Sequence, residues 1–515
     1  MARVWKSALL TLMLFAPAAI AAPAAVESGA IGGVRDGSVV SYKGIPYAAP
    51  PVGPLRWREP QPVAAWAGVR SAKSFAPACM QTGVSMPGET PPKVSEDCLY
   101  LNIWAPAQAK NLPVMVWIYG GGFANGSASM PLYWGDRLAR KGVIVVTFGY
   151  RVGPFGFLAH PELTAESPYH ASGNYGLLDQ IAALKWVRRN IAAFGGDSGC
   201  VTIAGQSAGA TSVSILMASP LAKGLFQRAI AESGGMFEPM QLAPDYQLAN
   251  AERVGKSYAQ SVGAKSLAEL RALPGASLLK GKAGVISHPV LDAYVMPRSP
   301  YDVFAAGEQN DVPILIGSNA NEARSLITDL DSVTAATFES GIIKHWGALP
   351  PQLYAGYPHA TDAEAVRARL DFERDLRFGW DMWAWAGLEA AHGKNPVYYY
   401  HFTRNPPFPK NSVYADWGPS HFAELWYSFD HLNQEPWAWS RADRRLADGM
   451  ARYWTNFARS GNPNEKGLPE WPRFTGDSPQ MLYLDDPIHA GPIASLKTLE
   501  VFDAIYTQVR GAGTH

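Results

Sequence analysis

Five uninterrupted apolar runs place the strongest constraint on what this 515-residue chain can fold into. They show no alternation of apolar and polar residues, which is typical of strands buried on both faces of a parallel sheet. Between them lie helical patterns that end in glycine, such as residues 176–196 and 444–461. The pattern predicts one large α/β domain with a mostly parallel central sheet flanked by helices. The expected strands are 114–120, 142–151, 200–205, 312–318 and 396–402.

Two further segments, near residues 236–310 and 325–395, carry helical patterns and look like insertions between strands. Insertions of this kind commonly form a cap over a pocket. The alternative is that they only cover the edges of the sheet. With 47% hydrophobic and 17% charged residues, the chain can build a large core without disorder.

The charge balance bears on partners. Lys+Arg and Asp+Glu are both 44, so the formal net charge is zero, whereas nucleic-acid-binding proteins usually carry a basic excess. No nucleic-acid partner is therefore expected. Beyond the N-terminus, no stretch is long and apolar enough for a membrane span. The sequence does not fix the oligomeric state, and a monomer is favoured.

The N-terminus has the features of a secretory signal peptide. Arg3 and Lys6 precede a short apolar run, and Ala19-Ile20-Ala21 is a small-x-small cleavage motif. We expect residues 1–22 to be removed and residues 23–515 to form a single domain in the periplasm or outside the cell. The alternative is an uncleaved membrane anchor, for which the apolar run is short.

Export to an oxidising compartment makes a disulfide plausible among the three cysteines. Cys79 and Cys98 lie close in sequence and form the natural pair, which would stabilise the fold by on the order of 3 kcal/mol. Cys200 is left over. It opens an apolar strand, so we expect it to be buried and inert.

Residues 205–210, "GQSAGA", place Ser207 between two glycines at the junction of an expected strand and a helix-prone segment. A serine at such a sharp turn takes a strained backbone geometry, and residues two positions away must be small to avoid collision. The turn exposes the hydroxyl at the carboxyl end of the sheet, beside the positive end of the following helix. We therefore predict that Ser207 is a nucleophile rather than one more small residue in a turn.

The glycine triplet in "VWIYGGGF" (116–123) ends another expected strand on the same side of the sheet. Glycines leave backbone N–H groups free to converge on a developing oxyanion. We predict that Gly121 and Gly122 form an oxyanion hole, with the N–H of Ala208 as a third donor. The alternative for the triplet is a flexible turn.

A serine nucleophile also needs a base, and in this type of site the order is serine, acid, histidine. Of the eleven histidines, His421 lies on a loop beyond the strand at 396–402 and begins a helical pattern. Catalytic residues gather at such positions in open α/β sheets. His401, within the strand, is interpreted as packing. We predict that His421 is the base.

The acid is expected after an intermediate strand. Glu322 follows the strand that ends at Gly317, and it would orient the imidazole and stabilise its cation. Asp292 and Asp302 have no strand directly before them. Asp292 is the better of these two alternatives.

Together these motifs make the chain similar to the type-B carboxylesterase (cholinesterase-like) family of the α/β-hydrolase fold. The resemblance runs from about residue 26 to 505. It rests on "GIPYAAPPVGPLRWREPQP" (44–62), "EDCLYLNIWAP" (96–106), "GGGF", "YRVGPFGFL" (150–158), "GNYGLLDQ" (173–180), "GGDSGCVTIAGQSAGA" (195–210), "GSNANEA", "GPSHFAEL" and "YWTNFARSGNPN" (453–464).

The resemblance implies the same roles as the residue patterns. It places the nucleophile on Ser207, the acid on Glu322 and the base on His421. It also implies an oxyanion hole at Gly121, Gly122 and Ala208, the disulfide Cys79–Cys98, and a structural ion pair between Arg56 and Glu96. No metal or other cofactor is implied.

Two departures from the family pattern concern the substrate. The family usually has Glu before the nucleophile, and here Gln206 makes the site less negative. The loop 80–97 has no aromatic residue to hold a quaternary ammonium group, which argues against a cholinesterase. The cysteines of the family's other two disulfides are also missing, which fits a bacterial exported member.

The predicted function is hydrolysis of a small-molecule carboxylic ester through an acyl-enzyme intermediate. One alternative keeps the site but changes the reaction, to an amidase, a lactonase or an acyl transferase. Another is a non-catalytic binding protein with this fold, since fold alone does not establish activity.

The sequence says least about the identity of the ester. Arg374 and Arg377 could meet an acidic acyl group, although arginines on a helix are usually solvated. Four tryptophans, at helical spacing typical of core residues, could instead shape an apolar pocket: Trp380, Trp383, Trp385 and Trp417.

Overall fold

The computed structural model describes residues 19–84, 86, 89–282 and 286–512. Its main feature is a sheet of twelve strands in the order β1-β4-β5-β9-β11-β10-β12-β13-β14-β15-β16-β17. In that order the strands are Ala19–Ile20, Val34–Asp36, Val39–Pro46, Tyr100–Pro106, Ile144–Phe148, Leu112–Ile118, Gly196–Gln206, Arg228–Glu232, Ile314–Asn319, Val397–Phe402, Gln480–Leu484 and His489–Pro492.

All five expected strands are present, as β10, β11, β12, β14 and β15, in one parallel block. The block also contains β13 and β16. Each has five residues, and neither was predicted from the apolar runs. The pairs outside this block are antiparallel, so the large sheet is mixed rather than uniformly parallel. Two small sheets accompany it, β2-β3-β6 (Ala24–Val26, Gly29–Gly32, Val69–Ser71) and β7-β8 (Ala78–Cys79, Val94–Ser95).

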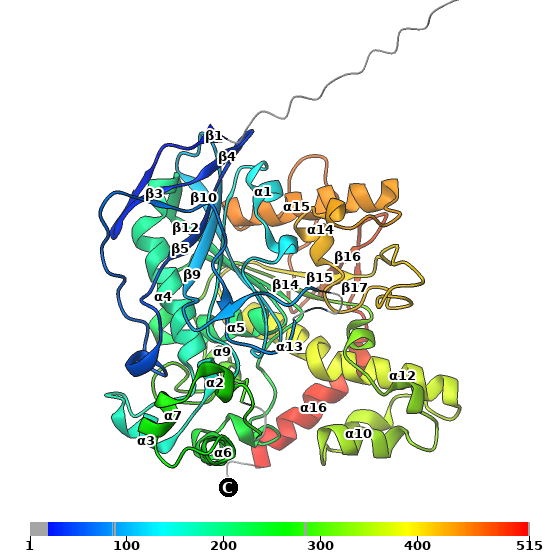
Figure 1. Cartoon of the computed structure of the whole chain (residues 1–515). Helices are drawn as coiled ribbons and strands as arrows, with labels where there is room; N and C mark the ends of the chain where they lie inside the picture. Colours follow the sequence, from blue (N-terminus) through cyan, green and yellow to red (C-terminus); the bar gives the residue numbers. More distant parts are fainter. Residues whose placement is uncertain (1–18, 85, 87–88, 283–285, 513–515) are drawn as a thin grey trace, which may run out of the picture.

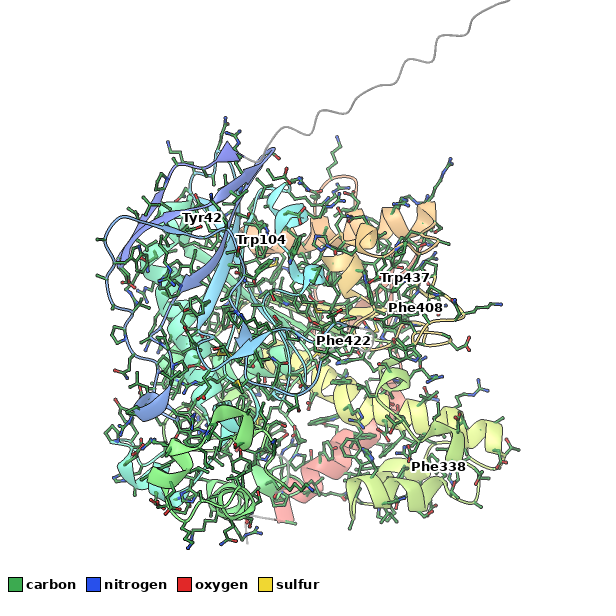
Figure 2. The ribbon with its side chains drawn as sticks, in the orientation of Figure 1. Tyr42, Trp104, Phe338, Phe408, Phe422 and Trp437 are labelled. Carbon is green, nitrogen blue, oxygen red and sulfur yellow. A yellow bond between two sulfur atoms is a disulfide. The ribbon has the colours of Figure 1, made fainter. Side chains whose placement is uncertain are left out.

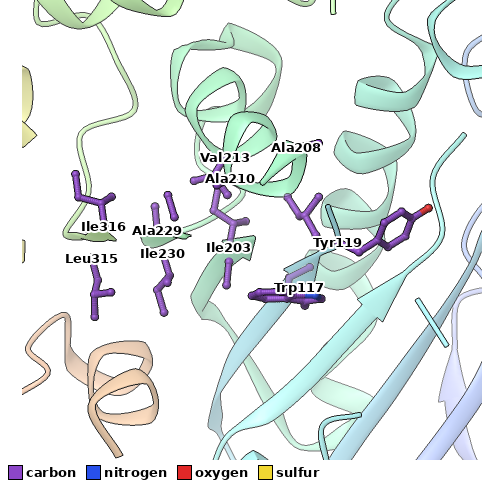
Figure 3. Packing of buried hydrophobic residues seen from close by; sticks show 14 of the residues in the cluster. Trp117, Tyr119, Ile203, Ala208, Ala210, Val213, Ala229, Ile230, Leu315 and Ile316 are labelled. Atoms are coloured by element: carbon purple, nitrogen blue, oxygen red, sulfur yellow. The ribbon is translucent and has the colours of Figure 1, made fainter. Parts of the chain in front are cut away.

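Helices cover both faces of the sheet, with α4 and α15 on opposite sides of the central strands (Figure 1). Leu315 and Ile316, successive residues of β14, point to opposite faces, as a strand requires (Figure 3). Ile316 and α5 residues Ala210 and Val213 lie on the same side. These side chains are fully buried, so both faces of the strands contribute to the core.

The helices predicted from the sequence form with small differences at their ends. The first is α4 (Tyr175–Asn190), which continues as a 3₁₀ turn to Phe194 and stops at Gly195, where φ is 81°. The second is α15 (Arg441–Ser460), which begins at a Ser440 capping box and ends at Gly461, where φ is 76°. A positive φ is accessible to glycine without strain, which explains both stops.

The remaining helices include α5, with 11 residues, α16, with 17 residues, and others that are short or belong to the insertions. They are α1 (Asp136–Ala139), α2 (Gly153–Phe157), α3 (Pro161–Glu166), α5 (Ala208–Ala218), α6 (Leu248–Ser261), α7 (Leu267–Ala272), α8 (Gly275–Leu278), α9 (Pro300–Ala305), α10 (Phe338–Trp346), α11 (Gln352–Ala355), α12 (Asp362–Arg374), α13 (Trp380–His392), α14 (Leu425–Ser428) and α16 (Leu496–Ala512).

Both predicted insertions are largely helical. The first contains α6 to α9, and the second contains α10 to α13, with a π-helical turn, η8 (Asp375–Gly379), joining α12 to α13. Figure 2 shows Phe422 near the middle of the molecule and Phe338 of α10 near its lower right edge. Residues of both insertions line a cavity described below, so they do more than cover the edges of the sheet.

The expected signal peptide falls mostly on residues 1–18, outside the described residues. The described chain begins with β1, which pairs antiparallel with β4. Cleavage near residue 22 therefore stays a prediction. None of the helices in the described part of the chain combines the length and apolar character needed to cross a membrane.

A buried carboxyl on α13 makes stability depend on pH. Glu389 is 2% exposed, and Gln309 Nε2 donates to its Oε2 over 3.1 Å. Burial raises the pKa of Glu389 from 4.5 to about 8. Between these two values the folded protein keeps a proton that the unfolded chain has lost, so this group makes the free energy of unfolding fall as pH rises.

We expect Glu389→Gln to weaken this pH dependence. Since one pKa unit corresponds to about 1.4 kcal/mol, the variant should gain up to a few kcal/mol relative to the parent between pH 5 and pH 8.5. Urea unfolding of both proteins at the two pH values measures the difference. Identical pH dependence in the two proteins would contradict the prediction.

Candidate active site

Ser207 lies at the turn between β12 and α5, with φ 58° and ψ −126°. A non-glycine residue in this region is strained. The flanking glycines are needed because backbone passes close by. A Cβ on Gly209 would lie 2.0 Å from the Ile118 carbonyl oxygen, and one on Gly205 would lie 2.5 Å from Gly209. The local geometry is that of a strand–turn–helix nucleophile elbow.

Glu322 and His421 meet because two loops run side by side beyond neighbouring parallel strands. Glu322 begins the 3₁₀ turn η6 (Glu322–Ser325) after β14, and His421 follows β15 and precedes α14. The Asn321 N–H donates to the Pro419 carbonyl over 3.0 Å, and Asn319 Nδ2 donates to the Ser420 carbonyl over 2.8 Å. These bonds fix the two loops against each other.

The Glu322 carboxylate is divided between two tasks. Its Oε2 lies 2.6 Å from His421 Nδ1, while its Oε1 accepts from Ser233 Oγ over 2.5 Å and from the Asn319 N–H over 2.7 Å. Glu322 and His421 are buried. A carboxylate at Nδ1 holds the imidazole proton there, which leaves Nε2 as the basic nitrogen.

Ser207 and His421 line the same cavity, which has a volume of about 580 Å³ and also contains Gly121, Gly122 and Ala208. No hydrogen bond joins Ser207 Oγ to His421 among the described residues. Likewise, the N–H groups of Gly121 and Gly122 donate to no group in the described part of the chain, so they are available to a ligand. Five of the six residues assigned from the sequence thus line one cavity, and the sixth, Glu322, lies behind His421.

Gln206 lies directly against the histidine. It is fully buried, and its Nε2 is 3.2 Å from His421 Nε2. Within the described structure its Oε1 has no hydrogen-bond partner. On the other side, Phe378 of η8 stacks on the imidazole with centroids 4.5 Å apart and planes 10° apart. The imidazole is therefore held between a neutral amide and an aromatic face.

Two other carboxyls lie near the site but are held toward their neutral form. Burial raises the pKa of Glu232 to about 8 and that of Glu424 well above its ordinary value. Trp454 Nε1 donates to Glu232 over 2.8 Å, and Asn319 donates to Glu424. Neither forms a hydrogen bond with His421 among the described residues, so Glu322 is the carboxylate that the structure brings to His421.

The alternative acid, Asp292, binds backbone N–H groups of its own loop. Its Oδ1 accepts the backbone N–H groups of Val295 over 2.7 Å and Met296 over 2.8 Å. Within the described structure it forms no hydrogen bond with His421, unlike Glu322. The carboxylate caps a turn, so its position does not support this alternative.

The two candidate arginines differ in their position relative to the cavity. Arg374 pairs with Asp371 and Asp375 and does not line the cavity, whereas Arg377 does. None of the four tryptophans proposed from the sequence lines this cavity, and two of them, Trp380 and Trp385, are buried in the core.

Residues missed by the sequence reasoning form much of the cavity wall. They come from the insertions, and no motif marks them, because which face of an insertion helix meets the cavity depends on packing. They include Glu238, Tyr246, Trp346, Phe378 and Asp381.

Other expectations concern stability. Cys79 and Cys98 form the predicted disulfide. Arg56 and Glu96 form the predicted ion pair, at 2.6 Å. Cys200 is free but only partly buried, with Arg228 Nη1 3.1 Å from its sulfur, so the expectation of a fully buried thiol is wrong.

A parallel sheet with a serine at a strained turn, and an acid and a histidine beyond neighbouring strands, defines an α/β-hydrolase. Solved structures agree. A PNB esterase matches with a TM-score of 0.80 and 33% identity, covering 93% of this chain and 99% of its own. A carboxylesterase of Geobacillus stearothermophilus matches with a TM-score of 0.81 and 32% identity over the same shares.

Sequence comparison identifies the family within the α/β-hydrolase fold. Residues 22–491 match the carboxylesterase family. The fumonisin B1 esterase of Sphingopyxis macrogoltabida is 39% identical over 87% of this chain and 84% of its own. The para-nitrobenzyl esterase of Bacillus subtilis is 35% identical over 90% and 94%. The chain belongs to the carboxylesterase family and is a carboxylic ester hydrolase rather than a non-catalytic binding protein.

Proposed function

We propose that this esterase hydrolyses a small-molecule ester through an acyl-enzyme on Ser207, with His421 as base and Glu322 as its partner. The observation that carries the proposal is one cavity lined by the strained serine and by a histidine whose Nδ1 lies 2.6 Å from a buried carboxylate. Hydrogen bonds to a nucleophile are often open without substrate and close when it binds.

In the first half of the reaction, Ser207 Oγ attacks the ester carbonyl while His421 Nε2 takes its proton. The oxyanion is stabilised by the N–H groups of Gly121, Gly122 and Ala208. Losing one such donor typically raises the barrier by about 3 kcal/mol. The C–O bond then breaks, and the imidazolium gives its proton to the departing alcohol.

In the second half, His421 deprotonates a water molecule that attacks the acyl carbon. The same N–H groups hold the oxyanion, and Ser207 leaves with the returned proton. Glu322 remains ionised and stabilises the imidazolium in both halves. Neither a metal nor another cofactor takes part in these steps.

Covalent titration tests the proposal. One equivalent of diethyl p-nitrophenyl phosphate should release one p-nitrophenolate per chain, abolish esterase activity, and leave a diethylphosphoryl group on the peptide that contains Ser207. Peptide mass spectrometry locates the group. Labelling at another residue, or full activity after labelling, would overturn the assignment.

The same site could serve an amidase, a lactonase or an acyl transferase. No feature of the cavity favours one of these over ester hydrolysis. Comparing the turnover of an ester and an amide of the same acid distinguishes an esterase from an amidase, because an esterase should hydrolyse the amide far more slowly.

We also propose that the chain is exported to the periplasm or the medium and acts there as a single domain, residues 23–515, with a monomer favoured. The support is the N-terminal charge and apolar pattern together with the Cys79–Cys98 disulfide. The intact mass of the exported protein should correspond to cleavage near residue 22. A mass that includes residues 1–21 would contradict export with cleavage.

A further inference from the structure

Two arginines of the second insertion share one carboxylate beside the cavity. Glu373 is fully buried. Its Oε1 accepts from Arg369 Nε over 2.5 Å, and its Oε2 accepts from Arg377 Nε and Nη2 over 2.9 and 2.7 Å. Two guanidinium groups and one carboxylate leave a net charge of +1 at this wall.

The two arginines differ in access. The Arg369 side chain is 1% exposed, and its Nη1 and Nη2 have no partner within the described structure. The Arg377 side chain is 21% exposed and lines the cavity that contains Ser207. Of the two arginines, Arg377 is therefore the one that presents charge to the cavity.

Arg377 is also held in place. Its guanidinium lies over the Trp346 ring, 4.4 Å from the centroid, and its Nη2 is 3.3 Å from His345 Nε2. Nη1 appears in no hydrogen bond with the described residues. The π-helical turn η8 carries both Arg377 and Phe378, which stacks on His421, and both residues line the cavity that contains Ser207.

The cavity also contains two acidic side chains, Glu238 and Asp381, on other elements of its wall. Burial raises the pKa of both groups, which favours their neutral forms. Neither forms an ion pair with Arg377 among the described residues.

We infer that the preferred substrates are esters that carry a free carboxylate, which pairs with Arg377. A guanidinium fixed by one carboxylate along its Nε edge, with Nη1 unused, can donate a charge-assisted hydrogen bond to a second carboxylate. The inference rests on the proposed ester hydrolysis and names the substrate class for the same site.

The test compares esters of equal size with and without the charge. Monoethyl esters of four- to eight-carbon dicarboxylic acids place a carboxylate in the acyl group. Acetyl esters of hydroxy acids place it in the alcohol. In each series the neutral control replaces the free carboxylate by a primary carboxamide. The measured quantity is the ratio of kcat/KM for the charged and neutral members.

We expect at least one charged ester to be favoured, and Arg377→Gln to lower its kcat/KM by about 10- to 100-fold, the scale of a hydrogen bond to a charged group. The neutral controls should change by less than about threefold. Arg377→Lys should keep part of the preference, because it keeps the charge but not the planar donor geometry. Glu373 stays paired with Arg369 in both variants, so the fold should persist.

Arg374→Gln is the matched control, because Arg374 lies three residues away but pairs outside the cavity, and its ratio should equal that of the parent. The inference is overturned if the neutral esters are hydrolysed and Arg377→Gln leaves the ratio unchanged in both series. Loss of the proposed function looks different, since neither the charged nor the neutral esters would then be hydrolysed.

Discussion

Ser207→Ala is expected to lower kcat for every ester by roughly a millionfold, the scale seen when a triad hydrolase loses its serine. Without the hydroxyl no acyl-enzyme can form, and His421 has no proton to remove. Alanine accepts the same backbone geometry as serine, so the turn between β12 and α5 should form as before. The measurement is turnover of p-nitrophenyl esters of increasing acyl length, in which the parent's optimum sizes the acyl pocket.

Equal circular dichroism and melting temperature serve as the control for folding of this variant. Residual turnover above about one part in a thousand, in protein freed of parent enzyme, would mean that another group carries the reaction. A parent that is folded yet hydrolyses none of these esters would instead point to a narrow natural substrate.

Glu322→Gln is expected to lower kcat by about 10³- to 10⁴-fold with little change in KM. The reason lies in the division of the Glu322 carboxylate. Its Oε1 accepts from Ser233 Oγ and the Asn319 N–H, so the amide oxygen of glutamine should take that place. The amide NH₂ group then faces His421 Nδ1 and donates to it.

A donor at Nδ1 forces the imidazole proton onto Nε2, where the base needs its lone pair. The variant would therefore hold the wrong tautomer in an otherwise unchanged site. Glu322→Asp, which keeps the charge, should lose less activity than Glu322→Gln. If Glu322→Gln retained more than a tenth of the parent kcat, Glu322 would not be the group that orients the base.

The residues proposed for chemistry could be placed from the sequence because their positions follow from local backbone requirements and from the strand pattern. The glycines around Ser207 are required by backbone atoms within a few ångströms, and that requirement appears directly in the sequence as "GQSAG". Glu322 and His421 each follow a strand, and parallel strands end at one edge of a sheet, so their approach follows from the strand pattern.

The sequence alone thus determined the central strands, the helix ends at glycine, the disulfide pair and the family. Only the tertiary structure showed β13, β16 and the antiparallel strands, because strand formation depends on packing against neighbours as well as on the local sequence. It also decided between Arg374 and Arg377, which one helical turn separates. Packing of the second insertion places Arg377 at the cavity and Arg374 outside it, and such packing joins segments far apart in the sequence.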